Sequence, residues 1–264
     1  MIDKVNGLRL AWDDAGSGLP ILLIHGFPLC RTMWRPQVEA LVAAGYRVIT
    51  PDLRGFGESE GAEEASMEIF ADDLLALLDH LGIEKAVVGG MSMGGYVLLN
   101  LLKQAPERFA AALFIVTRAG GEDAAGRDKR NQLATLAREV GAAPIADAFS
   151  SAVFAETVMN ERPQLVAEVR GWMEQTSPQG LIGGLMAIRD RDDSSNLLPN
   201  LHLPALVIGA DADNAIPLAE SQKLAAALPQ ASLVTLVGGG HMVNLEQPEP
   251  FNQALLEFLT TLSS

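Results

Sequence analysis

Ser92 is the residue with the clearest chemical signal, because residues 90–94 (GMSMG) fit the pattern G-x-S-x-G. An apolar run at residues 86–90 precedes it, and a helical run at residues 96–103 follows. A sharp turn from strand to helix forces a serine into an unfavourable backbone conformation and leaves room only for small flanking residues. The helix that begins there directs its amide dipoles at a developing oxyanion. The segment therefore predicts a serine nucleophile.

A nucleophilic serine needs a general base, and the chain has four histidines. His80 ends an expected helix, where the helix dipole favours it, and His202 precedes an expected strand, so both are interpreted as structural. His25 ends a strand at the start of a turn. His241 lies in the glycine-rich segment 237–242 (VGGGHM), between the last expected strand and the last expected helix. This position predicts that His241 is the base.

The base in turn needs a carboxylate that holds its tautomer and stabilises the imidazolium. The segment DADNAIP at residues 211–217 follows an apolar run and offers Asp211 and Asp213. The residues after Asp213 indicate a turn into the next helix, with Asp213 four positions before Pro217. This favours Asp213 as the acid, with Asp211 as the alternative.

An oxyanion hole is expected at the end of the first long apolar run, where the chain reads LLIHGFP (residues 22–28). The backbone N–H of Phe27, together with that of Met93 after the nucleophile, would supply two donors. Pro28 has no N–H and stiffens the loop instead.

The elements that must position these residues follow from hydrophobic patterning. Short apolar runs alternate with helical stretches, and their nearly continuous hydrophobicity is typical of parallel strands buried on both faces. Strands are expected at residues 21–25, 46–50, 85–90, 111–116, 205–210 and 232–237, and helices at residues 66–81 and 248–262. Ser66 can cap the first of these helices, and Gly82 can end it. The alternation predicts a mostly parallel, doubly wound α/β sheet.

The alternation stops between about residues 118 and 196, where only amphipathic helical segments are expected. A helical insertion between two strands of such a sheet is typical of a lid over its carboxyl edge, where open α/β folds bind ligands. We therefore expect a core at residues 1–118, a helical cap at 119–196 and the rest of the core at 197–264.

The composition limits the kinds of partner that the protein is expected to bind. The formal net charge of −14 opposes binding to nucleic acids. Cys30, the single cysteine, cannot form an internal disulfide, and no dense cluster of zinc ligands is apparent, so no metal or cofactor is expected. The N-terminal residues do not resemble a signal peptide, and no apolar run reaches the roughly 18 residues of a membrane span. These features predict a cytoplasmic protein without a membrane partner, and they do not indicate an oligomeric state.

The motifs, in their order along the chain, resemble those of the α/β-hydrolase superfamily over nearly the whole length. The segments that carry this resemblance are IHGFP, PDLRGFGES, GMSMGG, QAPERFAAL, DADNAIP and GGGHMVNLEQPE. The resemblance implies the α/β-hydrolase fold with a cap inserted before the strand that carries the acid. It also implies a triad of Ser92, Asp213 and His241, in that chain order, with an oxyanion hole at Phe27 and Met93.

The nucleophile distinguishes branches of this superfamily. Haloalkane dehalogenases and epoxide hydrolases use aspartate, whereas this chain has Ser92. Carbon–carbon bond hydrolases use serine but commonly have a different oxyanion loop and an aromatic residue after the base, where this chain has Met242. The segments GMSMGG and GHMVNLEQPEPF look most similar to small serine esterases, 3-oxoadipate enol-lactonases and cofactor-free perhydrolases.

The resemblance therefore implies a serine carboxylesterase that acts on small-molecule esters through an acyl-enzyme. An enol-lactonase, a perhydrolase or a carbon–carbon bond hydrolase with the same triad is the alternative, and a slow-turnover, receptor-like binding protein is another. An apolar substrate pocket is expected around the nucleophile, with Trp34 and Met91 from the core and Trp172 and Met173 from the cap.

Overall fold

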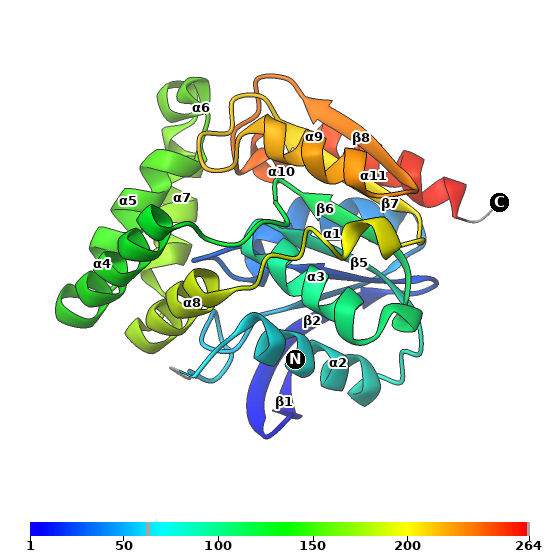
Figure 1. Ribbon diagram of the computed structural model, residues 1–264, viewed down its shortest axis with the longest axis horizontal. Helices are drawn as coiled ribbons and strands as arrows, with labels where there is room; N and C mark the ends of the chain where they lie inside the picture. The colour runs from blue at the N-terminus through cyan, green and yellow to red at the C-terminus, as the bar shows by residue number, and fades with distance from the viewer. Residues whose placement is uncertain (62–63, 263–264) are drawn as a thin grey trace.

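The computed structural model describes residues 1–61 and 64–262. Within them, eight strands form one sheet in the order β1-β2-β4-β3-β5-β6-β7-β8, with helices on both faces (Figure 1). Strands β3 to β8 run parallel to one another, whereas β2 pairs antiparallel with both β1 and β4. The expected mostly parallel, doubly wound sheet is confirmed. The strands are β1 (Ile2–Val5), β2 (Leu8–Gly16), β3 (Pro20–Ile24), β4 (Arg47–Pro51), β5 (Ala86–Met91), β6 (Phe109–Ile115), β7 (Ala205–Ala210) and β8 (Ala231–Leu236).

The N-terminal hairpin of β1 and β2 was not expected from the sequence. Asn6 and Gly7 form its turn with φ angles of 47° and 84°, the left-handed conformation that two-residue hairpin turns require. Both strands carry many exposed polar residues, so they lack the continuous hydrophobicity that marks the buried strands β3 to β7. The sheet consequently extends two strands beyond the parallel part.

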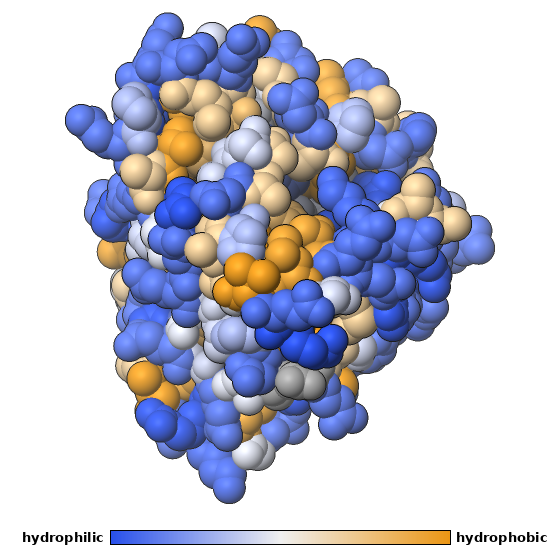
Figure 2. Space-filling model, turned by 90° about the vertical axis from the view of Figure 1, so that its left-hand side faces the viewer, coloured by the Kyte–Doolittle hydropathy of each residue, from blue (hydrophilic) through white to orange (hydrophobic). Residues whose placement is uncertain are grey.

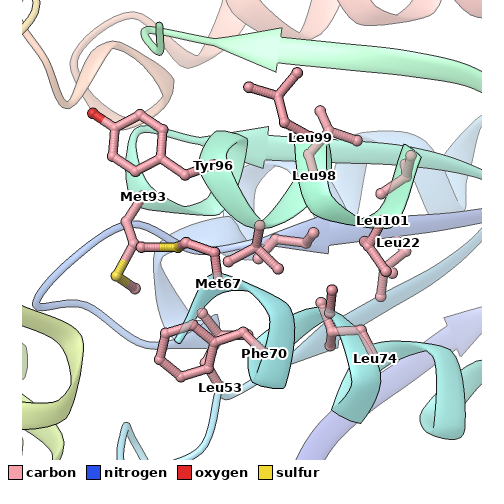
Figure 3. Close-up of a cluster of buried hydrophobic side chains, with 14 of the residues drawn as sticks. Leu22, Leu53, Met67, Phe70, Leu74, Met93, Tyr96, Leu98, Leu99 and Leu101 are labelled. Carbon is pink, nitrogen blue, oxygen red and sulfur yellow. The ribbon is translucent and has the colours of Figure 1, made fainter. Parts of the chain in front are cut away.

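Two groups of helices cover the sheet. Helices α2 (Met67–His80), α3 (Met93–Gln104) and α9 (Leu218–Ala227) contribute to one apolar cluster, and α1 (Arg35–Ala43) and α11 (Pro248–Thr261) contribute to the other. In the first cluster, side chains of α2 and α3 meet Leu22 of β3 (Figure 3). The Ser66 hydroxyl accepts a hydrogen bond from the N–H of Ile69 at 3.2 Å, as expected for the residue that caps α2.

All five cap helices lie between β6 and β7, on the left of Figure 1. They are α4 (Ala124–Val140), α5 (Ala143–Val153), α6 (Glu156–Glu161), α7 (Pro163–Glu174) and α8 (Pro178–Asp190). The expected helical insertion is confirmed. The face of the molecule on this side is mostly hydrophilic, with an apolar area near its centre (Figure 2).

Short helical segments complete the chain: η1 (Arg31–Trp34), η2 (Pro106–Arg108), η3 (Leu198–Asn200) and α10 (Val243–Glu246). Segment η1 leads into α1, and α10 leads from the loop after β8 into α11. No helix in the described part of the chain combines the length and the apolar character that crossing a membrane requires.

Candidate active site

Ser92 occupies the turn between β5 and α3 with φ of 54° and ψ of −115°. A positive φ is uncommon outside glycine and marks local strain. Strand β6 holds the turn from the side, because the Ser92 N–H donates to the Ile115 carbonyl at 3.0 Å and the Thr117 hydroxyl donates to the Ser92 carbonyl at 2.8 Å. The serine is therefore fixed in a strained conformation by the neighbouring strand.

The glycines around Ser92 are required by contact. A Cβ at Gly90 would lie 2.2 Å from the carbonyl oxygen of Gly94, and a Cβ at Gly94 would lie 2.3 Å from that of Ile24. A Cβ at Gly95 would lie 2.3 Å from the hydroxyl oxygen of Thr117. The steric reason inferred from the sequence for small flanking residues is thus visible in the packing.

His241 and Asp213 form a buried hydrogen-bonded pair, with 2.7 Å between His241 Nδ1 and Asp213 Oδ2. The other oxygen of Asp213 accepts the backbone N–H groups of Ala215 and Ile216 at 2.7 and 2.9 Å. The carboxylate is therefore held by its own turn. With Nδ1–H donating to Asp213, the Nε2 of His241 is the nitrogen available to accept a proton.

Asp211, the alternative acid, has a different partner. Its Oδ1 accepts the backbone N–H of Gly238 at 2.6 Å, and its side chain is exposed. The structure thus brings Asp213, and not Asp211, to His241.

The loop that carries His241 is anchored on both sides. The N–H of Gly240 donates to Oε2 of Glu246 at 2.8 Å, and the N–H of Met242 donates to the Val153 carbonyl of the cap at 3.0 Å. Burial raises the pKa of Glu246, and the N–H of Gly240 offsets part of that effect. The loop of His241 is therefore held by a glutamate of the core and by the end of α5.

A cavity of about 280 Å³ lies between the core and the cap. Ser92, His241, Phe27 and Met93 belong to its wall. Met93 is the first residue of α3, where a backbone N–H has no intrahelical acceptor, and no described residue accepts the N–H of Phe27. The rest of the wall is formed by Tyr96, Arg118, Glu122, Gly126, Lys129, Arg130, Phe149, Val153, Ile188, Ala215 and Ile216.

His25 lies in the core and is fully buried. Its Nδ1–H donates to the Gly26 carbonyl at 2.9 Å, and its Nε2 accepts the N–H of Leu53 at 3.0 Å. Burial lowers the pKa of His25, although nearby Asp52 acts in the opposite direction. These contacts make it a neutral residue that ties the end of β3 to the loop after β4.

The structure does not place the four expected pocket residues in the described wall of this cavity. Met91 and Trp34 are fully buried in the apolar cluster that packs against α1 and α11. Met91 is the last residue of β5, and side chains alternate between the faces of a strand, so it points into the opposite layer. Trp172 and Met173 of α7 also pack into that cluster. Sequence spacing had not revealed which face each side chain uses.

The charged part of the wall was not expected from the sequence. Arg118, Glu122, Lys129 and Arg130 come from the loop after β6 and the first turns of α4. Their signal was available, because a loop that directly follows a parallel strand lies at the carboxyl edge, where ligands bind.

Comparison with known proteins agrees with this geometry. A model of the alpha/beta hydrolase fold family matches residues 20–248. A thermophilic esterase from Thermogutta terrifontis, solved with malate bound, is 36% identical, with 100% of this chain and 99% of that chain covered and a TM-score of 0.95. The enol-lactonase from Burkholderia xenovorans is 30% identical over 98% of this chain and 100% of that one, with a TM-score of 0.91.

A bromoperoxidase from Bacillus anthracis is also similar, at 27% identity over 98% of this chain and 99% of that one, with a TM-score of 0.88. The family match covers most of the chain, including the serine turn and the loop with the histidine. With its parallel sheet, its strained serine turn and its helical insertion between β6 and β7, this chain belongs to the alpha/beta hydrolase fold family.

Proposed function

We propose that this protein is a serine carboxylesterase that hydrolyses small-molecule esters through an acyl-enzyme. The observation that carries the proposal is the buried hydrogen bond between His241 and Asp213, at the same cavity as the strained Ser92. The similarity to the Thermogutta terrifontis esterase supports the same activity.

In the acylation step, Nε2 of His241 takes the proton of the Ser92 hydroxyl as the oxygen attacks the ester carbonyl. Asp213 stabilises the imidazolium that forms. The backbone N–H groups of Phe27 and Met93 receive the oxyanion, a contact typically worth about 3–4 kcal/mol of barrier for each donor. His241 then returns its proton to the departing alcohol.

In the second step, His241 activates a water molecule, which attacks the acyl-enzyme and releases the acid. The cap covers the cavity and limits access of bulk water. The cavity of about 280 Å³ fits a small ester better than a long-chain lipid.

An enol-lactonase is the second candidate, because the Burkholderia xenovorans enzyme is 30% identical over nearly the full length of both chains. Lactone opening would use the same serine, base and oxyanion donors, with the alcohol remaining attached to the acyl group. Comparing p-nitrophenyl esters with enol-lactones on the purified protein distinguishes the two activities by their relative kcat/KM.

The nucleophile is tested by Ser92→Ala. We expect loss of p-nitrophenyl ester hydrolysis to background, with an unchanged circular dichroism spectrum, because the attacking oxygen is gone while the fold is retained. Retention of activity would contradict the proposal. A burst of p-nitrophenol followed by a stalled acyl-enzyme in the unmodified protein would instead indicate a receptor-like protein.

Two aspartate variants provide a matched pair in the same assay. Asp213→Asn should lower kcat by roughly 10⁴-fold, the scale seen when such a histidine loses its orienting carboxylate. Asp211→Asn, two residues away and exposed, should change kcat less than about threefold. The reverse result would assign the acid to Asp211.

A further inference from the structure

The cavity wall has an apolar part and a charged part. Phe27, Phe149 and Ile188 belong to the first, whereas Arg118 and Arg130 belong to the second, with Glu122 and Lys129 beside them. Such a group of cations is unexpected in a protein of net charge −14. The mechanism proposed above uses none of these charged side chains.

Glu122 is shared by three arginines. Its Oε1 accepts from Arg118 at 2.8 Å, and its Oε2 accepts from Arg191 at 2.9 Å and lies 3.4 Å from Nε of Arg130. Burial alone would raise the pKa of Glu122, but the three guanidinium groups hold it below its usual range, so the side chain is ionised. Three positive charges therefore meet one negative charge.

Arg191 is held mainly by groups of the protein itself. Its guanidinium lies 4.2 Å from the centre of the Tyr96 ring and donates to the carbonyl groups of Ile188 and Gly120. Only 3% of its side chain is exposed, and it does not belong to the described wall of the cavity. Arg191 therefore serves as the buried partner of Glu122, and the charges of Arg118 and Arg130 remain in excess.

The buried Nε–H groups of Arg118 and Arg191 both lack a hydrogen-bond partner among the described residues, so this feature does not distinguish the two arginines. Arg118 and Arg130 form no ion pair with a described carboxylate other than Glu122, and their side chains are 30% and 21% exposed. Two half-buried guanidinium groups that share one carboxylate at a cavity wall favour an anionic ligand, because a desolvated cation is stabilised by a partner of opposite charge.

We propose that this cavity selects esters or lactones that carry a second, free carboxylate group, which Arg118 and Arg130 bind while the ester carbonyl lies at Ser92. This inference rests on the proposed hydrolase function and specifies its substrate class. A carboxylate matches the planar fork of a guanidinium in charge and shape. Lys129, which lines the same wall, adds positive charge at the entrance.

The kinetic test uses two pairs of substrates in which a carboxylate replaces a methyl group of the same chain. p-Nitrophenyl hydrogen glutarate against p-nitrophenyl pentanoate places the carboxylate on the acyl side. The comparison of 4-acetoxybutanoate with butyl acetate places the carboxylate on the alcohol side. We expect kcat/KM to favour the carboxylate in one pair by roughly 10- to 100-fold, the range of a charge-assisted hydrogen bond.

Variants then assign that preference to residues. Arg118→Gln and Arg130→Gln should each lower the ratio of kcat/KM between carboxylate and neutral substrate by about tenfold. Arg118→Lys keeps the charge and should restore part of the ratio. Arg138→Gln is the matched control, because Arg138 lies on helix α4, as Arg130 does, but is exposed and outside the cavity wall. In this variant the ratio of kcat/KM between carboxylate and neutral substrate should stay unchanged.

The outcomes of these experiments test the carboxylate site independently of the proposed esterase function. Equal kcat/KM within both pairs, together with hydrolysis that depends on Ser92, would overturn the carboxylate site and leave the esterase standing. If no ester is hydrolysed, calorimetric titration of the folded protein with glutarate still tests the site, and absence of binding would overturn it. Binding of inorganic phosphate without binding of glutarate would likewise overturn the choice of a carboxylate.

Discussion

Two aspartates only two positions apart show how the fold assigns roles to single residues. Asp213 is buried, and its two oxygens are divided between His241 and the backbone of its own turn. Asp211 is exposed and holds the backbone N–H of Gly238, which belongs to the loop that carries His241. The first aspartate contacts His241 directly, whereas the second contacts the loop that carries it.

His25 predicts how stability depends on pH. Because burial lowers its pKa, the folded state keeps His25 neutral while the unfolded state takes up a proton. Protonation would also place an N–H of the ring against the N–H of Leu53. Stability from this group is therefore present above the unfolded pKa of about 6.5 and is lost as pH falls through the lower folded value.

The measurement is urea unfolding of the wild type and of His25→Gln at pH 7.5 and pH 5. The wild type should be the more stable of the two at pH 7.5, because the variant loses buried hydrogen bonds. The difference should narrow at pH 5, since the variant lacks the titrating group. A difference that stays constant between the two pH values would refute this account of His25.

At the scale of elements, the ends of β5 and β6 are both strained. Ser92 follows β5 with φ of 54°, and Val116 follows β6 with φ of 39°. The two turns are adjacent in the sheet and are joined by the hydrogen bond from the Thr117 hydroxyl to the Ser92 carbonyl. The serine and the loop that contains Arg118 therefore leave the sheet side by side, toward the same cavity.

The same turn predicts a contrast between two glycine substitutions. Gly90→Ala should lower the free energy of unfolding by about 1–3 kcal/mol, because the new Cβ would lie 2.2 Å from the Gly94 carbonyl oxygen, a backbone atom that cannot turn away. Gly171→Ala, within α7 and with open space around its Cβ position, should raise it by about 0.5–1 kcal/mol. Urea unfolding measures both, and equal effects would contradict the steric argument.

At the scale of the whole molecule, the cap is attached to the segment that carries His241. The N–H of Met242 donates to the Val153 carbonyl, and the guanidinium of Arg162, just before α7, donates to the Glu246 carbonyl at 2.9 Å. The core and the cap thus share hydrogen bonds beside His241. A displacement of the cap would disturb His241 as well as the cavity wall.

Arg162→Met tests this attachment by removing the donor while keeping an apolar stem. We expect the free energy of unfolding to fall by about 1 kcal/mol, the usual value of one hydrogen bond at a partly exposed site. We also expect kcat/KM for a neutral ester to fall severalfold, because the loop of His241 loses a contact. Arg138→Met, an exposed residue of α4, is the control, and equal kinetics in the two variants would argue against the coupling.

The sequence by itself determined the features that depend on short-range pattern. Continuous apolar runs predicted the six parallel strands. Five of them, β3 to β7, are buried, and strands buried on both faces carry few polar residues. Glycines at residues 90, 94 and 95 indicated the tight turn around Ser92, because close contact with backbone at residues 90 and 94, and with the Thr117 side chain at residue 95, excludes larger residues there. The helical insertion was visible because its apolar residues recur with helical spacing.

Only the tertiary structure decided which distant side chains meet. Glu122 and Arg191 are separated by 69 positions, and their pairing depends on how α8 returns to the core. Met91 and Trp34 were expected at the cavity but lie in the opposite apolar layer. The hydrophobicity of a residue predicts that its side chain is buried. Which apolar layer it enters depends on the direction of the backbone, and that direction is set by packing across the whole sheet.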